Sequence, residues 1–266
     1  MKETIGLLGV GNMGTAILEG LFEKKISAPP RVWIYDKIKA KPRDFAKKWK
    51  IHTAQSAGEL ARQSRWILLA VKPQDLLAVG AELKGVLTAR QGLISILAGT
   101  PILKLRKAVG AKAAIVRAMP NLGAKVGESM TVVTGGTREA LGAAREIFNG
   151  CGRTLTLPER FFDLVTALSG SGPAYFFYLM EMLAGFGISE GLSQKNAELL
   201  AIQTAMGAGK LAAAFPVSPK EWKDRVTSKK GTTEAALKVL KRSGADLVFA
   251  RAFRAALNRG RELSGS

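Results

Sequence analysis

The stretch Thr4–Gly14, "TIGLLGVGNMG", decides how the first half of this chain folds. It passes from an apolar strand pattern into Gly9-x-Gly11-x-x-Gly14, the glycine spacing of a dinucleotide-binding turn. The first glycine permits a tight bend, the second lets the backbone approach a pyrophosphate, and the third lets the following helix pack closely. The start of that helix favours an anion. Asp36 ends the next strand pattern, 22 residues after Gly14, which suits a dinucleotide-binding motif.

Strand and helix patterns alternate over the part of the chain that follows this motif. Short apolar runs are each followed by a turn or a helical pattern: 31–36, 65–71, 92–99, 113–121 and 128–136. After about Leu157 only helical patterns remain. We therefore predict an α/β fold: an N-terminal Rossmann-type, doubly wound, mainly parallel sheet in residues 1–158, followed by an all-α domain in residues 159–266.

The composition excludes several classes of enzyme. The 266 residues include one cysteine, Cys151, and one histidine, His52, so neither a cysteine-based zinc site nor a catalytic triad is expected, and no metal is predicted. The apolar runs are too short to span a membrane, and the N-terminus has no signal-peptide pattern. A single cysteine suits a cytoplasmic protein.

The net charge of +19 arises from 40 basic and 21 acidic residues. The basic residues are scattered and only 7% of residues are aromatic, so we expect an anionic small molecule, and no specific nucleic acid, as the partner. The helical part carries more apolar residues than a small bundle hides, which favours a homo-oligomer. The alternative is that these helices pack against the first domain.

The choice between NAD and NADP stays open at this point. Asp36 would bind the ribose 2′-hydroxyl of NAD. Four basic residues follow at once, and any of them could instead pair with the 2′-phosphate of NADP or simply face solvent: Lys37, Lys39, Lys41 and Arg43.

Five segments, in this order and spacing, resemble pyrroline-5-carboxylate reductases over nearly the whole chain: "GVGNMG", "AVKPQ", "RAMPN", "SGSGPAYFFYLMEML" and "VTSKKGTTEAAL". The resemblance implies NAD(P)H-dependent reduction of the cyclic imino acid 1-pyrroline-5-carboxylate to L-proline, the last step of proline biosynthesis. It also implies a helical dimerisation domain, an active site at the dimer interface, and dimers built into decamers.

The resemblance also assigns residues to the site. The cofactor contacts fall on Leu8, Gly9, Val10, Gly11, Asn12 and Met13, on Ala70, Val71, Lys72 and Pro73, and on Ile96, Leu97 and Ala98. The glycine motif itself adds Gly14 and Asp36 to the expected cofactor residues. The substrate contacts fall on Met119, Pro120 and Asn121 and on Ser228, Gly231, Thr232 and Thr233. The backbone N–H groups of the loop from Ser228 to Thr233 would hold the substrate carboxylate. The Thr233 hydroxyl, the predicted catalytic group, would hydrogen-bond the imine nitrogen.

The chain departs from the family at two places near the substrate. Leu122-Gly123 stands where the family has Thr-Pro, and Lys229-Lys230 stands where it has Pro-Gly. We expect the two lysines to add positive potential beside the substrate. Two alternatives therefore remain: a reductase of a related cyclic imine or keto acid, and a nucleotide-binding homologue without activity.

Overall fold

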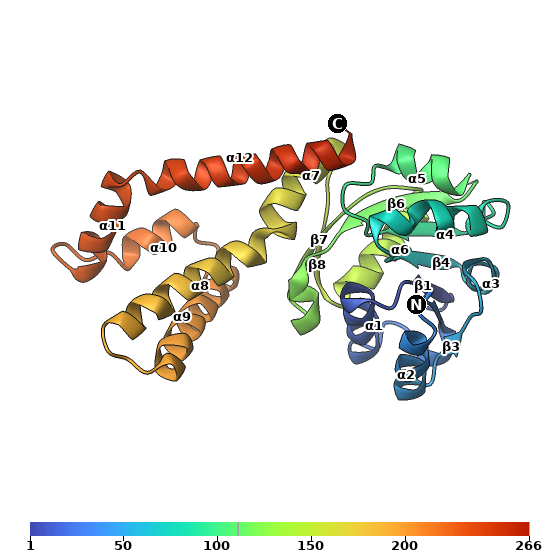
Figure 1. Ribbon diagram of the computed structural model, residues 1–266, viewed down its shortest axis with the longest axis horizontal. Helices are drawn as coiled ribbons and strands as arrows, with labels where there is room; N and C mark the ends of the chain where they lie inside the picture. Colours follow the sequence, from blue (N-terminus) through green and yellow to red (C-terminus); the bar gives the residue numbers. More distant parts are fainter. Residues whose placement is uncertain (111, 266) are drawn as a thin grey trace. The chain divides into compact units, whose positions relative to one another are not determined.

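The structure, a computed structural model, describes residues 1–110 and 112–265 (Figure 1). Contacts divide the chain into a first unit, Met1–Ser171 with Ala256–Ser266, and a second unit, Gly172–Ala255. The predicted division between residues 158 and 159 rests on another criterion, the end of the strand patterns, and stays a prediction.

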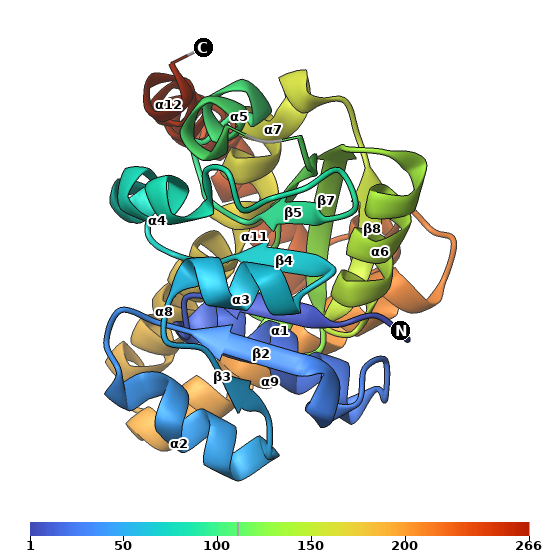
Figure 2. The ribbon, with the colours of Figure 1, turned by 90° about the vertical axis from the view of Figure 1, so that its right-hand side faces the viewer.

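One sheet of eight strands forms the centre of the first unit, in the order β3-β2-β1-β4-β5-β6-β7-β8. Figure 2 shows the strands from β3 to β5 side by side in this order. Every neighbouring pair is parallel except β6 and β7, which confirms the predicted mainly parallel sheet. The strands are β1 (Ile5–Leu8), β2 (Val32–Tyr35), β3 (His52–Thr53), β4 (Trp66–Leu69), β5 (Gly92–Ser95), β6 (Ala114–Met119), β7 (Ser129–Gly135) and β8 (Gly152–Thr156).

Both faces of this sheet are buried under helices, as a doubly wound fold requires. In β4, Leu68 belongs to the core on one face, while Ile67 and Leu69 belong to the core on the other face, because successive side chains in a strand alternate. The helices of this unit are α1 (Asn12–Glu23), α2 (Ala40–Trp49), α3 (Ala57–Gln63), α4 (Leu76–Leu83), α5 (Ile102–Val109), α6 (Arg138–Asn149) and α7 (Phe162–Val165).

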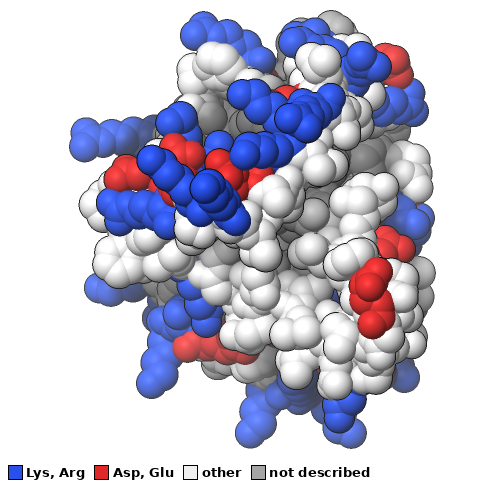
Figure 3. Space-filling model, turned by 90° about the vertical axis from the view of Figure 1, so that its left-hand side faces the viewer, with Lys and Arg blue, Asp and Glu red and all other residues white. Residues whose placement is uncertain are grey.

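The second unit is helical in the part that the structure describes. Its helices are α8 (Gly172–Ser189), α9 (Gln194–Ala214), α10 (Pro219–Arg225), α11 (Thr232–Arg242) and the first part of α12 (Ala245–Ser264), whose last residues belong to the first unit. Many large apolar side chains of α8 and α9 are exposed, among them Phe176 and Phe186. Figure 3, which views this side, shows broad uncharged areas beside clustered Lys and Arg side chains.

The start of α1 and the whole of α10 (Pro219–Arg225) are helical features that the sequence patterns did not predict. The helix after the glycine loop begins directly at Asn12, because Gly11 is already its extended N-cap residue. Helix α10 was not predicted, although Ser218 and Glu221 have the spacing of a capping box. The Ser218 hydroxyl accepts a hydrogen bond from the Glu221 N–H at 3.2 Å, so this cap was the available signal.

No helix in the described residues combines the length and the apolar character that crossing a membrane demands.

Candidate cofactor site and substrate loop

The glycine loop between β1 and α1 is tightly packed at two of its three glycines. Gly9 has φ +100°, and a β-carbon there would lie 2.6 Å from the Ala70 carbonyl oxygen. A β-carbon on Gly14 would lie 2.5 Å from the Gly9 carbonyl oxygen. A β-carbon on Gly11, in contrast, would meet no described atom within 4 Å. Packing within the described residues therefore does not explain Gly11, and the space beside it is open, as the predicted approach of a pyrophosphate requires.

Asp36 fixes the shape of this loop. One of its carboxylate oxygens accepts a hydrogen bond from the Val10 N–H at 2.8 Å, and the other accepts one from the Ile38 N–H at 2.9 Å. The Gly9 N–H donates to the Tyr35 carbonyl at 2.8 Å, which ties the loop to the end of β2. Asp36 thus has a structural role in addition to its predicted contact with the cofactor.

A cavity of about 300 Å³, here called the glycine-loop cavity, opens at the carboxyl ends of β1, β2 and β4. It brings together six of the predicted cofactor residues: Gly9, Gly11, Asp36, Ala70, Val71 and Lys72. This position at the strand ends is where doubly wound sheets bind ligands.

The other predicted cofactor residues lie around this cavity without lining it. Leu8 ends β1, Val10 is buried behind the loop, Asn12, Met13 and Gly14 begin α1, and Pro73 begins the turn after β4. Ile96, Leu97 and Ala98 follow β5, with Leu97 buried and Ala98 exposed.

Further residues line the glycine-loop cavity that the sequence did not single out, among them Tyr35 and Glu82. Desolvation, with smaller contributions from Glu82 and Asp36, raises the pKa of the Tyr35 phenol, which therefore stays a hydrogen-bond donor at neutral pH. The only sequence feature that could have placed Tyr35 at this cavity was its position at the end of the strand β2. The contribution of Glu82 depends on tertiary packing and has no local sequence signal.

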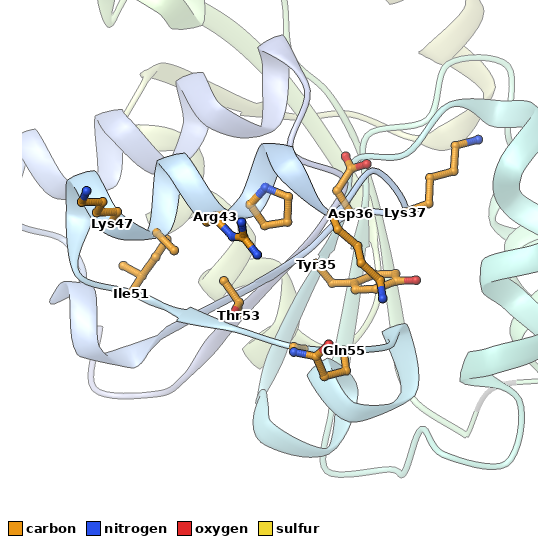
Figure 4. Close-up of a pocket in the computed structure, with 12 residues that line it drawn as sticks. Tyr35, Asp36, Lys37, Arg43, Lys47, Ile51, Thr53 and Gln55 are labelled. Atoms are coloured by element: carbon orange, nitrogen blue, oxygen red, sulfur yellow. The ribbon is translucent and has the colours of Figure 1, made fainter.

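A second cavity, of about 450 Å³, lies between α2 and the segment around β3, and is here called the α2–β3 cavity. It shares Tyr35, Asp36 and Lys37 with the glycine-loop cavity. Figure 4 shows Arg43 extending from α2 toward Thr53, while Lys37 extends in the opposite direction. The Lys37 ammonium pairs with Asp75 at 2.7 Å.

The three predicted substrate residues of the first unit follow β6. Asn121 caps the next turn: its side-chain oxygen accepts from the Gly123 N–H at 3.0 Å, and its side-chain nitrogen donates to the Ser169 hydroxyl at 3.1 Å. Pro120 is buried, and Met119 is partly buried. The departure at Gly123 has a structural reason, since a β-carbon there would lie 2.6 Å from the Glu128 carbonyl oxygen.

The four predicted substrate residues of the second unit lie together at the start of α11. Gly231 is the N-cap residue and provides no side-chain cap, so Thr233, two residues into the helix, is not the cap. Among the described residues, neither the N–H groups of Thr232 and Thr233 nor the Thr233 hydroxyl has a hydrogen-bond partner. A β-carbon on Gly231 would lie 2.3 Å from the Ser228 hydroxyl oxygen, so glycine keeps this turn tight.

Lys230 adopts the left-handed conformation in this turn, with φ +60°. Its N–H donates to a Glu234 carboxylate oxygen at 2.8 Å, and Lys238 pairs with the same oxygen at 3.2 Å. These contacts, with the Lys230 N–H as the main cause, lower the pKa of Glu234, which therefore remains ionised at neutral pH. The turn is thus formed with a lysine in the left-handed region, at the expense of backbone strain.

Comparison with known proteins covers the chain from end to end. Residues 159–263 match the family model for pyrroline-5-carboxylate reductase dimerisation, and residues 4–99 match the model for NADP oxidoreductase, coenzyme F420-dependent. The chain is 37% identical to a pyrroline-5-carboxylate reductase of Methanosarcina acetivorans over 98% of both chains.

Two solved structures extend the likeness to three dimensions. A pyrroline-5-carboxylate reductase of Coxiella burnetii aligns with a TM-score of 0.93 at 33% identity over 99% of both chains. A pyrroline carboxylate reductase of Plasmodium falciparum with NADP bound aligns with a TM-score of 0.87 at 29% identity, over 99% of this chain and 98% of that one.

Proposed function

The chain belongs to the pyrroline-5-carboxylate reductase family, and we propose that it reduces 1-pyrroline-5-carboxylate to L-proline with NADPH or NADH, the last step of proline biosynthesis. The fit of the glycine loop to a dinucleotide supports the cofactor, because packing demands glycine at positions 9 and 14 and open space is left at Gly11. The residues of the glycine-loop cavity, with the start of α1, would hold the dinucleotide.

The reaction asks little of the protein beyond binding and orientation. When bound, the reduced nicotinamide supplies a hydride to the ring carbon of the protonated C=N bond, and the π electrons of that bond become the nitrogen lone pair of proline. A protonated imine is already an electrophile, so neither a metal nor a histidine is required for this step. The chain's own contribution is to hold the carboxylate and the ring nitrogen in place.

The observation that carries this proposal is the set of unpaired groups at the start of α11. The N–H groups of Thr232 and Thr233 are free to bind a carboxylate, and the helix dipole favours an anion there. The Thr233 hydroxyl, which no described residue engages, is free to hydrogen-bond the ring nitrogen. Met119, Pro120 and Asn121 complete the proposed substrate set, with Asn121 acting through the turn that it caps.

The proposal also covers the oligomeric state of the protein and its location in the cell. The match of residues 159–263 to a dimerisation model supports a homo-oligomer, and the exposed apolar residues of α8 and α9 suit one. A decamer built from dimers is the larger assembly that we propose. We also propose a cytoplasmic location, because Cys151 is the single cysteine of the sequence and no disulfide can form within the chain.

The test measures NAD(P)H oxidation on addition of 1-pyrroline-5-carboxylate, with L-proline identified as the product. We expect turnover by the wild type and a loss of about 10- to 100-fold in kcat/KM for Thr233→Ala, the value of one hydrogen bond to a charged or polarised group. Thr233→Ser should restore most of it. Ser243→Ala, which removes a hydroxyl at the other end of α11, is the matched control and should behave as wild type.

Other outcomes would each contradict a stated part of the proposal. Absence of wild-type turnover with both cofactors would overturn the function. Turnover only with another cyclic imine or a keto acid would show that the departures at Leu122-Gly123 or Lys229-Lys230 have changed the substrate. Full activity in Thr233→Ala would remove the role given to its hydroxyl.

A further inference from the structure

A single π-helical turn, Thr166–Gly170, lies between α7 and α8 within the first unit, and the proposed function has not used it. The Ser171 N–H donates to the Thr166 carbonyl at 2.8 Å, across the five-residue spacing that defines such a turn. Isolated π turns are rare, and they occur frequently at functional sites. The contacts of Ser169 and Gly170 point to such a role here.

Ser169 holds the side chain of Asn121, one of the predicted substrate residues. The Asn121 side-chain nitrogen donates to the Ser169 hydroxyl at 3.1 Å, and that hydroxyl donates to the Met130 carbonyl at 3.4 Å. The Asn121 side-chain oxygen accepts from the Gly123 N–H at 3.0 Å. Because the amide is bonded at both its oxygen and its nitrogen, these contacts set which way it faces.

The backbone of Asn121 is anchored to β7 as well. Its N–H donates to the Ser129 hydroxyl at 3.1 Å, and the Ser129 and Thr131 hydroxyl oxygens lie 3.2 Å apart. Both hydroxyl side chains are buried. A buried polar group is costly to leave without a partner, so this network favours one arrangement of the segment that follows β6.

Gly170, the next residue of the π turn, leaves room for the side chain of Met119. A β-carbon on Gly170 would lie 2.5 Å from the Met119 Cε. Met119 also packs against the small apolar cluster that contains Phe162. Two consecutive residues of the turn therefore contact the two predicted substrate residues that flank Pro120.

We propose that Ser169 is a positioning residue of the reductase: it fixes the Asn121 amide and thereby holds residues 119–121 in the arrangement that binds the imino acid. The inference rests on the proposed function, because it takes this segment as part of the substrate site. The second side-chain N–H of Asn121 has no acceptor among the described residues. The orientation that Ser169 sets thus decides where this donor points.

Ser169→Ala removes the hydroxyl that accepts from Asn121. We expect the KM for the imino acid to rise about three- to tenfold, the value of one neutral hydrogen bond, with kcat unchanged. The Kd for NADPH, measured by fluorescence titration, should stay at the wild-type value. A merely structural defect would instead lower the folded fraction, and with it the apparent kcat, without a change in KM. Ser169→Cys keeps a weak donor and acceptor, so its KM should lie between the two.

Thr166→Val is the matched control. It removes a hydroxyl from the same π turn at similar shape, and this hydroxyl donates to the Phe162 carbonyl at 2.8 Å. Its KM should equal that of the wild type. Gly170→Ala tests the other contact of the turn, and it should raise KM because the added β-carbon displaces Met119. Hydrogen exchange of residues 119–123 gives a readout independent of turnover, and it should be faster in Ser169→Ala than in Thr166→Val.

Three outcomes would decide against the inference. Wild-type KM and wild-type exchange in Ser169→Ala would overturn it, and so would an equal rise of KM in Thr166→Val. If the wild type reduces the imino acid and Ser169→Ala does so with the same KM, only this inference fails. If the wild type does not reduce the imino acid, the proposed function fails and the inference fails with it.

Discussion

Lys230 adopts the left-handed backbone conformation, which residues other than glycine rarely adopt. It lies in the turn that precedes the predicted catalytic threonine, Thr233. The family resemblance leads one to expect glycine at this position, and the Lys230 N–H donates a hydrogen bond to the Glu234 carboxylate. Lys230 is exposed, and it lies close in the chain to Thr232 and Thr233, whose N–H groups are free among the described residues. Backbone strain and positive charge are therefore both consequences of this one substitution.

Two substitutions at this position separate strain from charge. Lys230→Gly should raise the free energy of unfolding by about 1 kcal/mol, because it removes a β-carbon from the left-handed region. Lys230→Ala keeps the strain and removes only the charge, so its stability should stay near that of wild type. Both variants should raise the KM for the imino acid by about fivefold or less at low salt, and the difference should shrink as salt is added.

The control for strain is Lys25→Gly, which changes another lysine of positive φ, +54°, in the first unit. It should gain stability without any change in KM. Thermal unfolding and initial rates over a range of salt provide the measurements. An unchanged KM in both Lys230 variants would reduce the lysine to a solvated side chain and leave only the strain effect.

At the scale of elements, the loop between β5 and α5 is packed against the last turn of α12 within the first unit. Gly99 has φ +60°, and a β-carbon there would lie 2.8 Å from the Leu263 β-carbon. The Ser264 hydroxyl donates to Asp163 at 2.9 Å and anchors the end of α12. The predicted cofactor residues Ile96 to Ala98 directly precede Gly99, so this packing fixes the start of their loop.

Gly99→Ala should therefore weaken cofactor binding as well as stability. We expect a rise of about tenfold in the Kd for the preferred dinucleotide, measured by fluorescence titration, together with a lower Tm. The control is Gly127→Ala, which also has positive φ but whose β-carbon would meet no described atom within 4 Å. That variant should lower Tm and leave Kd unchanged; an equal rise in Kd would show that strain alone, and not contact with Leu263, explains the effect.

The same elements show what the sequence could and could not predict. Glycine spacing and the position of Asp36 predicted the tight turn between β1 and α1, because their physical requirements are local; its contact with the cofactor stays a prediction. The pairing of Lys37 with Asp75 depends on tertiary packing between distant segments, so the sequence could not tell which basic residues after Asp36 stay free. The sequence likewise could not predict the hydrogen bond of Asn121 to Ser169, since this partner lies 48 residues away in the chain.

At the scale of the whole molecule, the two units bury their apolar residues to different degrees. The first unit encloses its sheet on both faces. In α8, among the described residues, only Gly172 and Ala184 are buried, while Phe176, Phe186 and both leucines of the helix are exposed. Apolar area of this extent on a helical pair calls for a protein partner, and the dimerisation match points to a second copy of this chain.

A charge placed on that surface should disrupt the assembly. Phe186 is 66% exposed, so Phe186→Glu costs little in an isolated chain but would bury an unpaired carboxylate in an interface. Light scattering after size-exclusion chromatography should give a multiple of the chain mass for wild type and a smaller species for this variant. Leu103→Glu, at a side chain 63% exposed on α5 of the first unit, is the matched control and should keep the wild-type mass. Circular dichroism verifies that both variants stay helical.

Two outcomes would contradict assembly through α8. The first is a wild type that is monomeric at micromolar concentration. The second is equal dissociation of both variants, because Leu103→Glu places the same charge on an exposed leucine of the other unit.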